Sequence, residues 1–253
     1  YNNLLDIDSA IGLLNDLETK KSVFLIHKHN NPCGVAIRDN LLDAYLDALS
    51  CDNISAFGGI LTSNQTIDIK VAEEINKLFF EVLIAPNFSN SALDILKSKK
   101  NRIIIKLKTY PINKLQTRSC LNGILEQDID DKIEKFDDFK VVTKVSPNST
   151  KSDDLVLASI IVKHTKSNCI AIVKNNQLIG CGMGQVSRID ALNQAIQKSK
   201  KFGFDLNESC LASDAFFPFS DCVEISHANN INSIVQPGGS IKDQDSIDFC
   251  NKN

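Results

Sequence analysis

Apolar positions along the chain follow two different periods, which predicts helices alternating with strands. Apolar residues three and four apart predict helices over residues 8–20, 40–50, 67–80, 90–98, 152–164 and 188–202, with further helices starting at 221 and 243. Short apolar runs predict strands starting at residue 24 and at 55–61, 81–86, 102–106, 167–174, 177–182, 211–214 and 233–235. Strands that alternate with helices predict a parallel or mixed sheet with helices on both faces.

Residues 109–150 are less regular and predict a connecting layer. We place a domain boundary near residues 147–149, which divides the chain into residues 1–148 and 149–253. The sequence shows no tandem repeat. Within the second predicted helix we expect a buried apolar face formed by Leu41, Leu42, Tyr45, Leu46 and Leu49.

Polar residues interrupt the first predicted strand where it stops in a turn marked by Pro32 and Gly34. Lys28 and His29 stand at this point, and open α/β sheets place ligands at strand ends. A lysine beside a histidine suggests a proton acceptor next to an anion or oxyanion stabiliser. The alternative is a surface lysine and a polar strand cap.

Three other patterns carry candidate chemistry. Gly58 and Gly59 mark either a close approach by another backbone or ligand, or a plain bulge. Residues 182–190 form a glycine-rich turn that opens a helix, which is an anion site without a recognised nucleotide motif. Around Phe216 three phenylalanines predict mainly core packing, although Phe216 itself can stack on a flat ring.

Composition narrows the function classes. The net charge is −3, so no strong field recruits nucleic acid, and 43% hydrophobic residues are ordinary for a globular protein. No apolar run has the length of a membrane span, and no secretory signal opens the chain, so we expect a cytosolic location. The chain begins at Tyr1 rather than Met, so a leader could precede it.

The sequence contains eight cysteines and no C-x-x-C pair, which argues against a cysteine-based zinc site. We expect reduced thiols that are mostly buried as small apolar residues. Cys33 alone lies in a motif that looks chemical, and His29 is close enough in sequence to activate it. A packing role for Cys33 is the favoured interpretation, because nothing else marks the thiol as activated.

Several segments together resemble the formyltransferase domain of a bifunctional purine biosynthesis family, AICAR transformylase/IMP cyclohydrolase. The resemblance covers essentially the whole chain in order. It rests on residues 28–34, 55–59, 167–168, 184–188 and 213–219, and also on 1–5 and 236–240.

The resemblance implies a cytidine-deaminase-like, three-layer α/β/α fold with two similar subdomains and mixed sheets, without the deaminase zinc. It implies transfer of a formyl group from the co-substrate 10-formyltetrahydrofolate to the 5-amino group of AICAR (aminoimidazole carboxamide ribotide), without a catalytic metal. It implies a homodimer with sites at the interface. Nucleic acid and membrane are not expected partners.

The resemblance also assigns residues to roles. His29 is the base, and Lys28 and Asn168 stabilise and orient the transition state. Substrate contacts fall to Gly58, Glu81, Asn168, Arg188 and Phe216, and folate contacts to Ile189, Asp221, Ser240 and Ile241. A structural monovalent cation such as potassium would be held by Val162, Thr165, Ser167 and Asp214, with Cys169 in place of an oxygen-bearing residue.

Three further positions depart from the family pattern. Glu81 stands where the family often has aspartate, His27 where an aliphatic residue is usual, and Arg38 where glycine is common. Two alternatives to the transferase remain: a non-catalytic nucleotide- or folate-binding remnant, and a zinc-independent deaminase-like hydrolase acting on a purine ring.

The resemblance predicts that the chain is an incomplete piece of a longer polypeptide. The family normally carries an upstream cyclohydrolase domain, which nothing here matches, so that the full-length protein would also be an IMP cyclohydrolase, a hydrolase activity. Its flanking segments supply arginines to the nucleotide phosphate. Losing two such contacts would raise the dissociation constant of AICAR by about two to four decades, so we expect the isolated residues to be nearly inactive.

Overall fold

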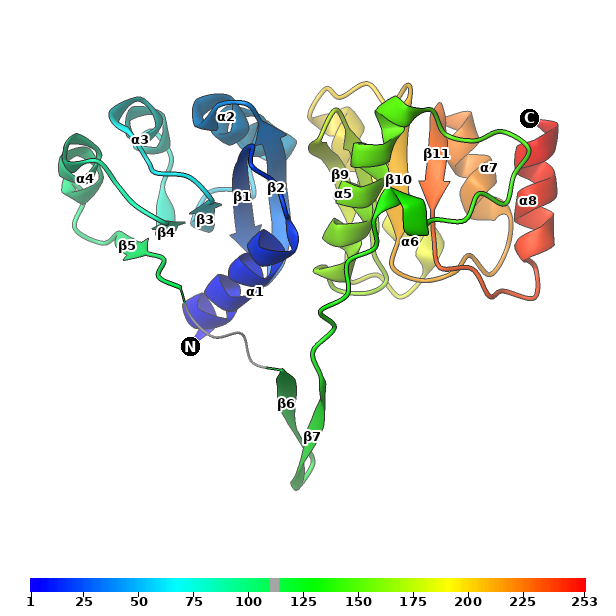
Figure 1. Cartoon of the computed structure of the whole chain (residues 1–253), viewed down its shortest axis with the longest axis horizontal. Coiled ribbons are helices and arrows are strands. Elements are labelled where there is room, and N and C mark those ends of the chain that lie inside the picture. Colours follow the sequence, from blue (N-terminus) through cyan, green and yellow to red (C-terminus); the bar gives the residue numbers. More distant parts are fainter. Residues whose placement is uncertain (110–113) are drawn as a thin grey trace.

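The computed structural model describes residues 1–109 and 114–253. A nine-stranded mixed sheet in the order β11-β10-β8-β9-β2-β1-β3-β4-β5 runs through the molecule (Figure 1). The helices α1 and α5 pack on one face of this sheet, and α2, α3, α4, α6 and α7 pack on the other. The fold is therefore the predicted three-layer α/β/α arrangement, with strands of both parts joined in one mixed sheet.

The elements follow one another in alternation along the chain. The strands are β1 (Ser22–Lys28), β2 (Asn31–Arg38), β3 (Gly59–Ser63), β4 (Phe80–Ala85), β5 (Ile103–Lys106), β6 (Leu115–Cys120), β7 (Gly123–Asp128), β8 (Ile170–Lys174), β9 (Gln177–Gly182), β10 (Ser209–Ser213) and β11 (Ile231–Val235). The α-helices are α1 (Asn2–Asp16), α2 (Leu41–Cys51), α3 (Ile69–Ile75), α4 (Asn90–Lys97), α5 (Ser152–Lys163), α6 (Arg188–Lys201), α7 (Asp221–Ala228) and α8 (Asp243–Lys252).

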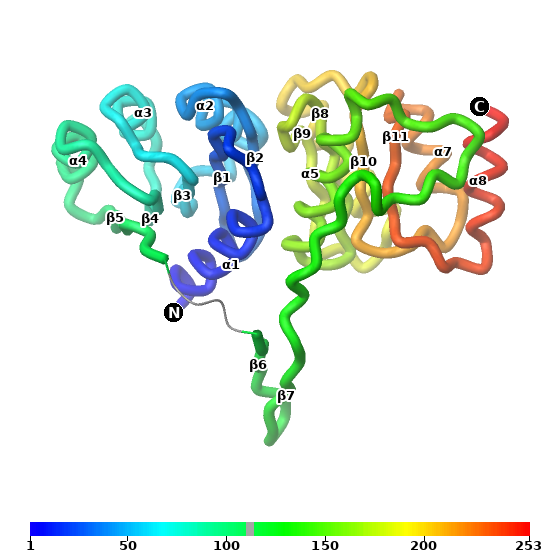
Figure 2. The backbone as a smooth tube through the Cα atoms, viewed as in Figure 1, coloured from blue at the N-terminus to red at the C-terminus, as the bar shows by residue number. Residues whose placement is uncertain are grey.

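Two parts of the chain repeat one order of elements: helix, hairpin, helix, strand, helix, strand, helix. The first runs from α1 through the β1–β2 hairpin to α4, and the second from α5 through the β8–β9 hairpin to α8. In both, the hairpin's first strand pairs antiparallel with the third strand, which pairs parallel with the fourth. No tandem repeat in the sequence predicted this order, and the boundary near residues 147–149 stays a prediction. Between the two parts the β6–β7 hairpin extends away from the sheet (Figure 2).

Both hairpins close through a two-residue turn with positive φ angles. These are 54° and 60° at His29 and Asn30, and 53° and 57° at Asn175 and Asn176. Such turns match the right-handed twist of the strands. Because asparagine tolerates positive φ, Asn175 and Asn176 between the strands expected over residues 167–174 and 177–182 predict a tight hairpin, and this is confirmed. In the first hairpin the prediction was wrong, because Pro32 and Gly34, which were expected to mark the turn, lie inside β2.

Glycines bring helices close to the two central strands. A Cβ atom on Gly34 of β2 would lie 2.2 Å from the Ala48 carbonyl oxygen in α2, and one on Gly182 of β9 would lie 1.8 Å from that of Ala191 in α6. The helices therefore rest directly on these strands. Because α2 packs so closely, small residues face the sheet, and Leu46, which we expected to be buried, is 41% exposed.

Other boundaries differ from the predictions for local reasons. The first helix begins at Asn2 rather than near residue 8, because its exposed leucines give no clean periodic signal. The predicted strand at 55–61 begins only at Gly59, because the Asp52 carboxylate accepts from both the N–H and the hydroxyl of Ser55 and holds a turn. Gly58 adopts φ +71° there. A Cβ atom on Gly59 would lie 2.9 Å from the His27 carbonyl oxygen, which is the close approach of another backbone, and the β3–β4 pairing shifts register after Gly59 as in a bulge. Both expected explanations of the glycine pair therefore apply.

The two parts of the sheet meet along β2 and β9, which pair only at Ala36 and Gln177. Arg38 strengthens this junction: it pairs with Asp47 at 2.5 Å and donates to the Asn175 carbonyl at 2.8 Å. The side chain that departs from the family pattern therefore has a structural role across the junction.

His27 is buried among apolar residues of β1 and is 0% exposed. Its two ring nitrogens have no hydrogen-bond partner within the described residues. Burial, and secondarily the charge of His164, lowers the pKa of His27 from 6.5 to about 3. The folded protein therefore keeps this imidazole neutral at pH values where the unfolded chain protonates it.

Replacing His27 with leucine should flatten the pH dependence of stability. The unfolded state binds the extra proton below pH 6.5, so His27 makes the wild type progressively less stable as the pH falls toward 3. At pH 5 the contribution is about 2 kcal/mol. Urea denaturation of both proteins at pH 7 and pH 5 measures it, and the same loss in the variant would contradict the account.

Candidate functional site

The residues predicted to act on substrate lie along one edge of the sheet. β1 ends where β3 begins, with His27 opposite Ile60, and β4 runs parallel to β3. β10 ends where β8 begins, with Ser213 opposite Ile170, and β2 begins where β9 ends. At this edge the first hairpin's first strand, β1, ends, whereas the matching strand of the second part, β8, begins. The lysine–histidine turn after β1 therefore lies at the same edge as the glycine-rich turn after β9.

Lys28, His29 and Gly58 form the hairpin cluster at this edge. Lys28 Nζ donates to the Phe57 carbonyl oxygen at 2.6 Å, and the Gly58 N–H donates to the Phe79 carbonyl at 2.8 Å. The Phe57 and Phe79 rings contact each other in a tilted arrangement, with centroids 4.9 Å apart. His29 is exposed at the turn, so its imidazole is free to meet a ligand.

Glu81 stands next to the hairpin cluster. It follows Phe80, whose register partner is Gly59 at the start of β3. The residue is half-buried. A carboxylate at this place can accept hydrogen bonds from sugar hydroxyls, which is the role that the resemblance gives it.

A second group, the Asp214 network, lies where β8 begins and β10 ends. Asp214 pairs with the Arg188 guanidinium, accepts from the Ser167 hydroxyl, and accepts from the Cys169 N–H at 2.7 Å. Arg188 also donates to the Cys169 carbonyl at 3.3 Å. The Arg188 and Asp214 side chains are only 8% and 13% exposed, so this ion pair is largely desolvated.

Asn168 extends the Asp214 network toward the glycine-rich turn. Its Nδ2 atom donates to the Gln185 carbonyl at 2.8 Å, and the Asn168 N–H donates to the same oxygen at 3.2 Å. The Asn31 side chain accepts from the Lys166 N–H at 3.1 Å, which ties this region to the first hairpin. The hairpin cluster and the Asp214 network are therefore neighbours along one edge of the sheet.

The predicted folate residues are spread around the second part of the fold. Asp221 opens α7, and its carboxylate accepts from the Cys222 N–H at 2.8 Å. Ser240 accepts from the Lys242 N–H at 3.1 Å, and Ile241 is fully exposed. Ile189 is half-buried in the first turn of α6. None of these contacts joins them to the hairpin cluster.

The phenylalanine run behaves differently from the core prediction. Phe217 alone is buried, whereas Phe216 is 45% and Phe219 is 52% exposed. The chain passes from β10 toward α7 here, so only one of the three rings can face the core. The exposed Phe216 ring is available to stack on a ligand, as its alternative role requires.

The proposed cation ligands surround the same start of β8. The Thr165 hydroxyl donates to the Ile161 carbonyl at 2.6 Å, Ser167 donates to Asp214, and Val162 is buried. At Cys169 the side chain faces Cys181, with 3.9 Å between the sulfur atoms. Within the part of the chain that the structure describes, no group of three or more His, Cys, Asp or Glu residues could hold a metal ion. This oxygen-based set stays a prediction.

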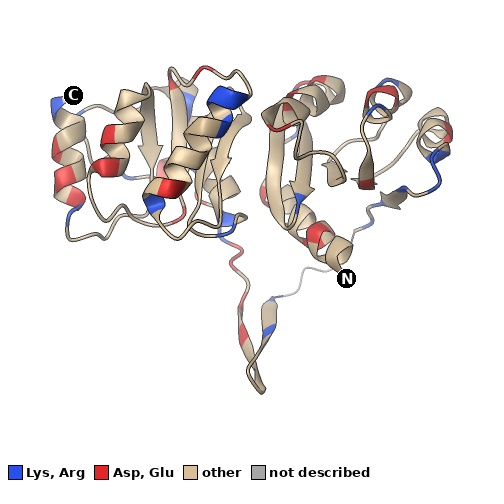
Figure 3. Ribbon diagram, turned by 180° about the vertical axis from the view of Figure 1, so that it is seen from behind, with Lys and Arg blue, Asp and Glu red and all other residues tan. Residues whose placement is uncertain are grey.

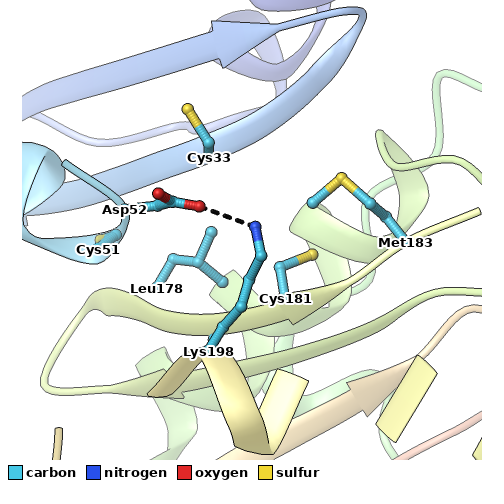
Figure 4. Close-up of a pocket in the computed structure, with 8 residues that line it drawn as sticks. Cys33, Cys51, Asp52, Leu178, Cys181, Met183 and Lys198 are labelled. Carbon is cyan, nitrogen blue, oxygen red and sulfur yellow. Dashed lines mark hydrogen bonds and ion pairs between the residues drawn. The ribbon is translucent and has the colours of Figure 1, made fainter. Parts of the chain in front are cut away.

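A small cavity lies at the junction of β2 and β9 (Figure 4). Cys33 lines it, and the Lys198 ammonium pairs with Asp52 at 2.8 Å across it. About 10 Å³ is open to the centre of a water molecule, which is the lower limit for one water. Burial raises the pKa of the Cys33 thiol to about 12. A nucleotide does not fit here, and the protonated thiol favours the packing role.

Sequence reasoning missed the residues that hold the turn around His29. Asp6 accepts from the Asn30 N–H at 2.6 Å, and Ser9 donates to the Asn30 carbonyl at 3.1 Å. Both lie on α1, more than twenty positions before the turn. The only local signal was the polar face of a helix whose start was itself misplaced.

The distribution of charged residues and the apolar character of the helices add little to this description of the site. Basic and acidic residues are interspersed over both parts of the fold (Figure 3). No helix among residues 1–109 and 114–253 is long and apolar enough to span a bilayer.

Comparison with known proteins places the chain in one family. The family model described as the AICARFT/IMPCHase bienzyme matches residues 1–198. A bifunctional purine biosynthesis protein PurH from Bacteroides thetaiotaomicron is 52% identical over 252 residues, covering 100% of this chain and 49% of that protein. PurH from Caldicellulosiruptor saccharolyticus is 46% identical, and PurH from Aquifex aeolicus 43%, each over 100% of this chain and 48% and 49% of those proteins. The chain thus spans about half the length of these curated relatives.

Proposed function

Because the chain belongs to the AICARFT/IMPCHase bienzyme family, we propose that it carries out formyl transfer from 10-formyltetrahydrofolate to the 5-amino group of AICAR. The observation that carries this proposal is the hairpin cluster, where a histidine is held exposed beside a lysine at a sheet edge. The matching relatives are bifunctional purine biosynthesis proteins, which is consistent with such a step.

His29 serves as the general base in this proposal. The amine of AICAR is a weak nucleophile because its lone pair is conjugated with the imidazole carboxamide, so it must lose a proton as it attacks the formyl carbon. The Lys28 ammonium and the Asn168 amide stabilise the oxyanion that develops on the formyl oxygen. Collapse of this intermediate breaks the bond between the formyl carbon and N10 of the folate, and N10 takes up a proton as tetrahydrofolate leaves. The Asp214 network orients Arg188 toward the nucleotide, while Gly58 and Glu81 hold the ribose.

We further propose a homodimer, in which the hairpin cluster of one protomer meets the Asp214 network of its partner. An isologous contact between two protomers would bring the two groups together at two equivalent sites. Folate would then lie near Ile189, Asp221, Ser240 and Ile241. We also propose a cytosolic location, and IMP cyclohydrolase activity for the full-length protein that contains these residues.

A folate-dependent absorbance assay tests the reaction. The intact natural protein that contains these residues should consume 10-formyltetrahydrofolate only when AICAR is present. Tight AICAR binding without folate consumption would show a binding remnant, and folate-independent release of ammonia would show a hydrolase. Either result would overturn the transferase.

Mixing two inactive variants tests the homodimer. His29→Asn lacks the base of the hairpin cluster, whereas Asp214→Asn disrupts the Asp214 network. Exchange of subunits would create one site with both groups intact, so activity should return in the mixture. Continued inactivity after verified subunit exchange would show that each chain builds its site alone.

A further inference from the structure

The turn that carries His29 is held by the first helix of the chain. Asp6 Oδ1 accepts from the Asn30 N–H at 2.6 Å, and Ser9 Oγ donates to the Asn30 carbonyl at 3.1 Å. Both polar backbone groups of Asn30 are therefore bound to α1. We propose that Asp6 is a positioning residue that fixes this turn and so aims the His29 imidazole at the reacting amine. This inference rests on the proposed function.

The turn needs such support because of its backbone conformation. His29 and Asn30 have φ angles of 54° and 60°. The left-handed region is disfavoured for residues with a Cβ atom, although asparagine and histidine tolerate it better than most. Conformations of this kind persist where surrounding contacts over-determine them. A carboxylate bound to the Asn30 N–H supplies that constraint through a charge-assisted hydrogen bond.

The second part of the fold provides an independent instance of the same arrangement. Asp154 on α5 accepts from the Asn175 N–H at 2.9 Å and from the Asn176 N–H at 2.6 Å. α5 precedes its hairpin as α1 precedes the first one. A helix carboxylate on the turn amides is therefore a repeated element of the fold. Only the first turn carries a histidine, so only there does the carboxylate control a reactive side chain.

The repeat also accounts for the lysine. Lys28 Nζ donates to the Phe57 carbonyl at 2.6 Å, and Lys174 Nζ, at the matching place in β8, donates to the Asp205 carbonyl at 3.1 Å. In each part the lysine that precedes the turn binds the loop before the third strand. The position of His29 is consequently set from two sides: by Asp6 through the turn and by Lys28 through the strand end.

Three variants of the intact natural protein test the role of Asp6. Asp6→Ala should lower kcat by about ten- to a hundredfold, with the dissociation constant of AICAR near its wild-type value, because the base is misplaced while the nucleotide contacts remain. Asp6→Asn keeps an oxygen acceptor and should restore most of kcat. Asp154→Ala removes the matching carboxylate and should leave kcat close to wild type, after correction for any unfolded fraction.

Hydrogen exchange gives a readout that needs no substrate. In Asp6→Ala the Asn30 amide should exchange faster, while the Asn175 and Asn176 amides stay protected; Asp154→Ala should show the reverse. Unchanged exchange at Asn30 with unchanged kcat would overturn the inference. An equal loss of kcat in Asp154→Ala would also overturn it, because that would be a general effect on the fold. If the wild type transfers no formyl group, the proposed function fails, and exchange at Asn30 still decides whether Asp6 holds the turn.

Discussion

Replacing His29 with asparagine should slow formyl transfer by about 10²–10⁴-fold, while AICAR still binds. The amide cannot accept the proton that the attacking amine must lose. Asparagine suits the backbone, because Asn175 occupies the matching turn position with φ 53°. His29→Ala should lose the same chemical step, but alanine is strained at the φ of 54° found at this position. Single-turnover kinetics and calorimetric binding of AICAR measure the two quantities separately.

The matching substitution Asn175→His serves as the control. It places a histidine in the second turn, far from the proposed substrate, and should leave turnover near the wild-type value. Near wild-type turnover in His29→Asn would refute the assignment of the base. A loss of AICAR binding as large as the loss of rate would instead make His29 a binding residue.

Replacing Asp214 with asparagine should lower the free energy of unfolding by about 3–5 kcal/mol. Asparagine can still accept from the Cys169 N–H, but the Arg188 guanidinium is left without its counter-charge in a largely buried place. Urea denaturation measures the change. Adding Arg188→Met should recover much of the loss, because the unpaired charge is then removed as well.

Asn64 provides the matched control for Asp214. Its side chain accepts from the Val23 N–H at 2.8 Å at the start of β1, as Asp214 accepts from Cys169 before β8, but it has no charged partner there. Asn64→Ala should therefore cost about 1–3 kcal/mol. A loss in Asp214→Asn that is no larger than this would show that the ion pair with Arg188 contributes little.

Local signals in the sequence predicted most of the elements. The helix predicted over residues 40–50 starts at a residue type that favours helix caps, and Asn40 indeed caps α2 by accepting from the Asp43 N–H. The asparagine pair predicted the second hairpin turn because asparagine tolerates positive φ. The first turn was misplaced because histidine seldom indicates a positive φ angle. The nearby Pro32 and Gly34 indicate turns strongly, but they lie in β2.

Long-range relations could not be predicted in this way. The sheet continues through one residue pair between β2 and β9, and no periodicity encodes that pairing. The sequence does suggest that the candidate residues share one edge, because their motifs lie at the ends of predicted strands. Their separation into a hairpin cluster and an Asp214 network, and the contact from Asp6 to the turn, depend on tertiary hydrogen bonds between distant segments.

Following an isotopically labelled formyl group through a single turnover tests the central claim most directly. The intact natural protein is mixed with labelled 10-formyltetrahydrofolate and AICAR, and the label is located by NMR. The account predicts that the label appears on the former 5-amino nitrogen of AICAR, at a rate that falls sharply in His29→Asn. Label that stays on the folate or appears only as free formate would contradict it.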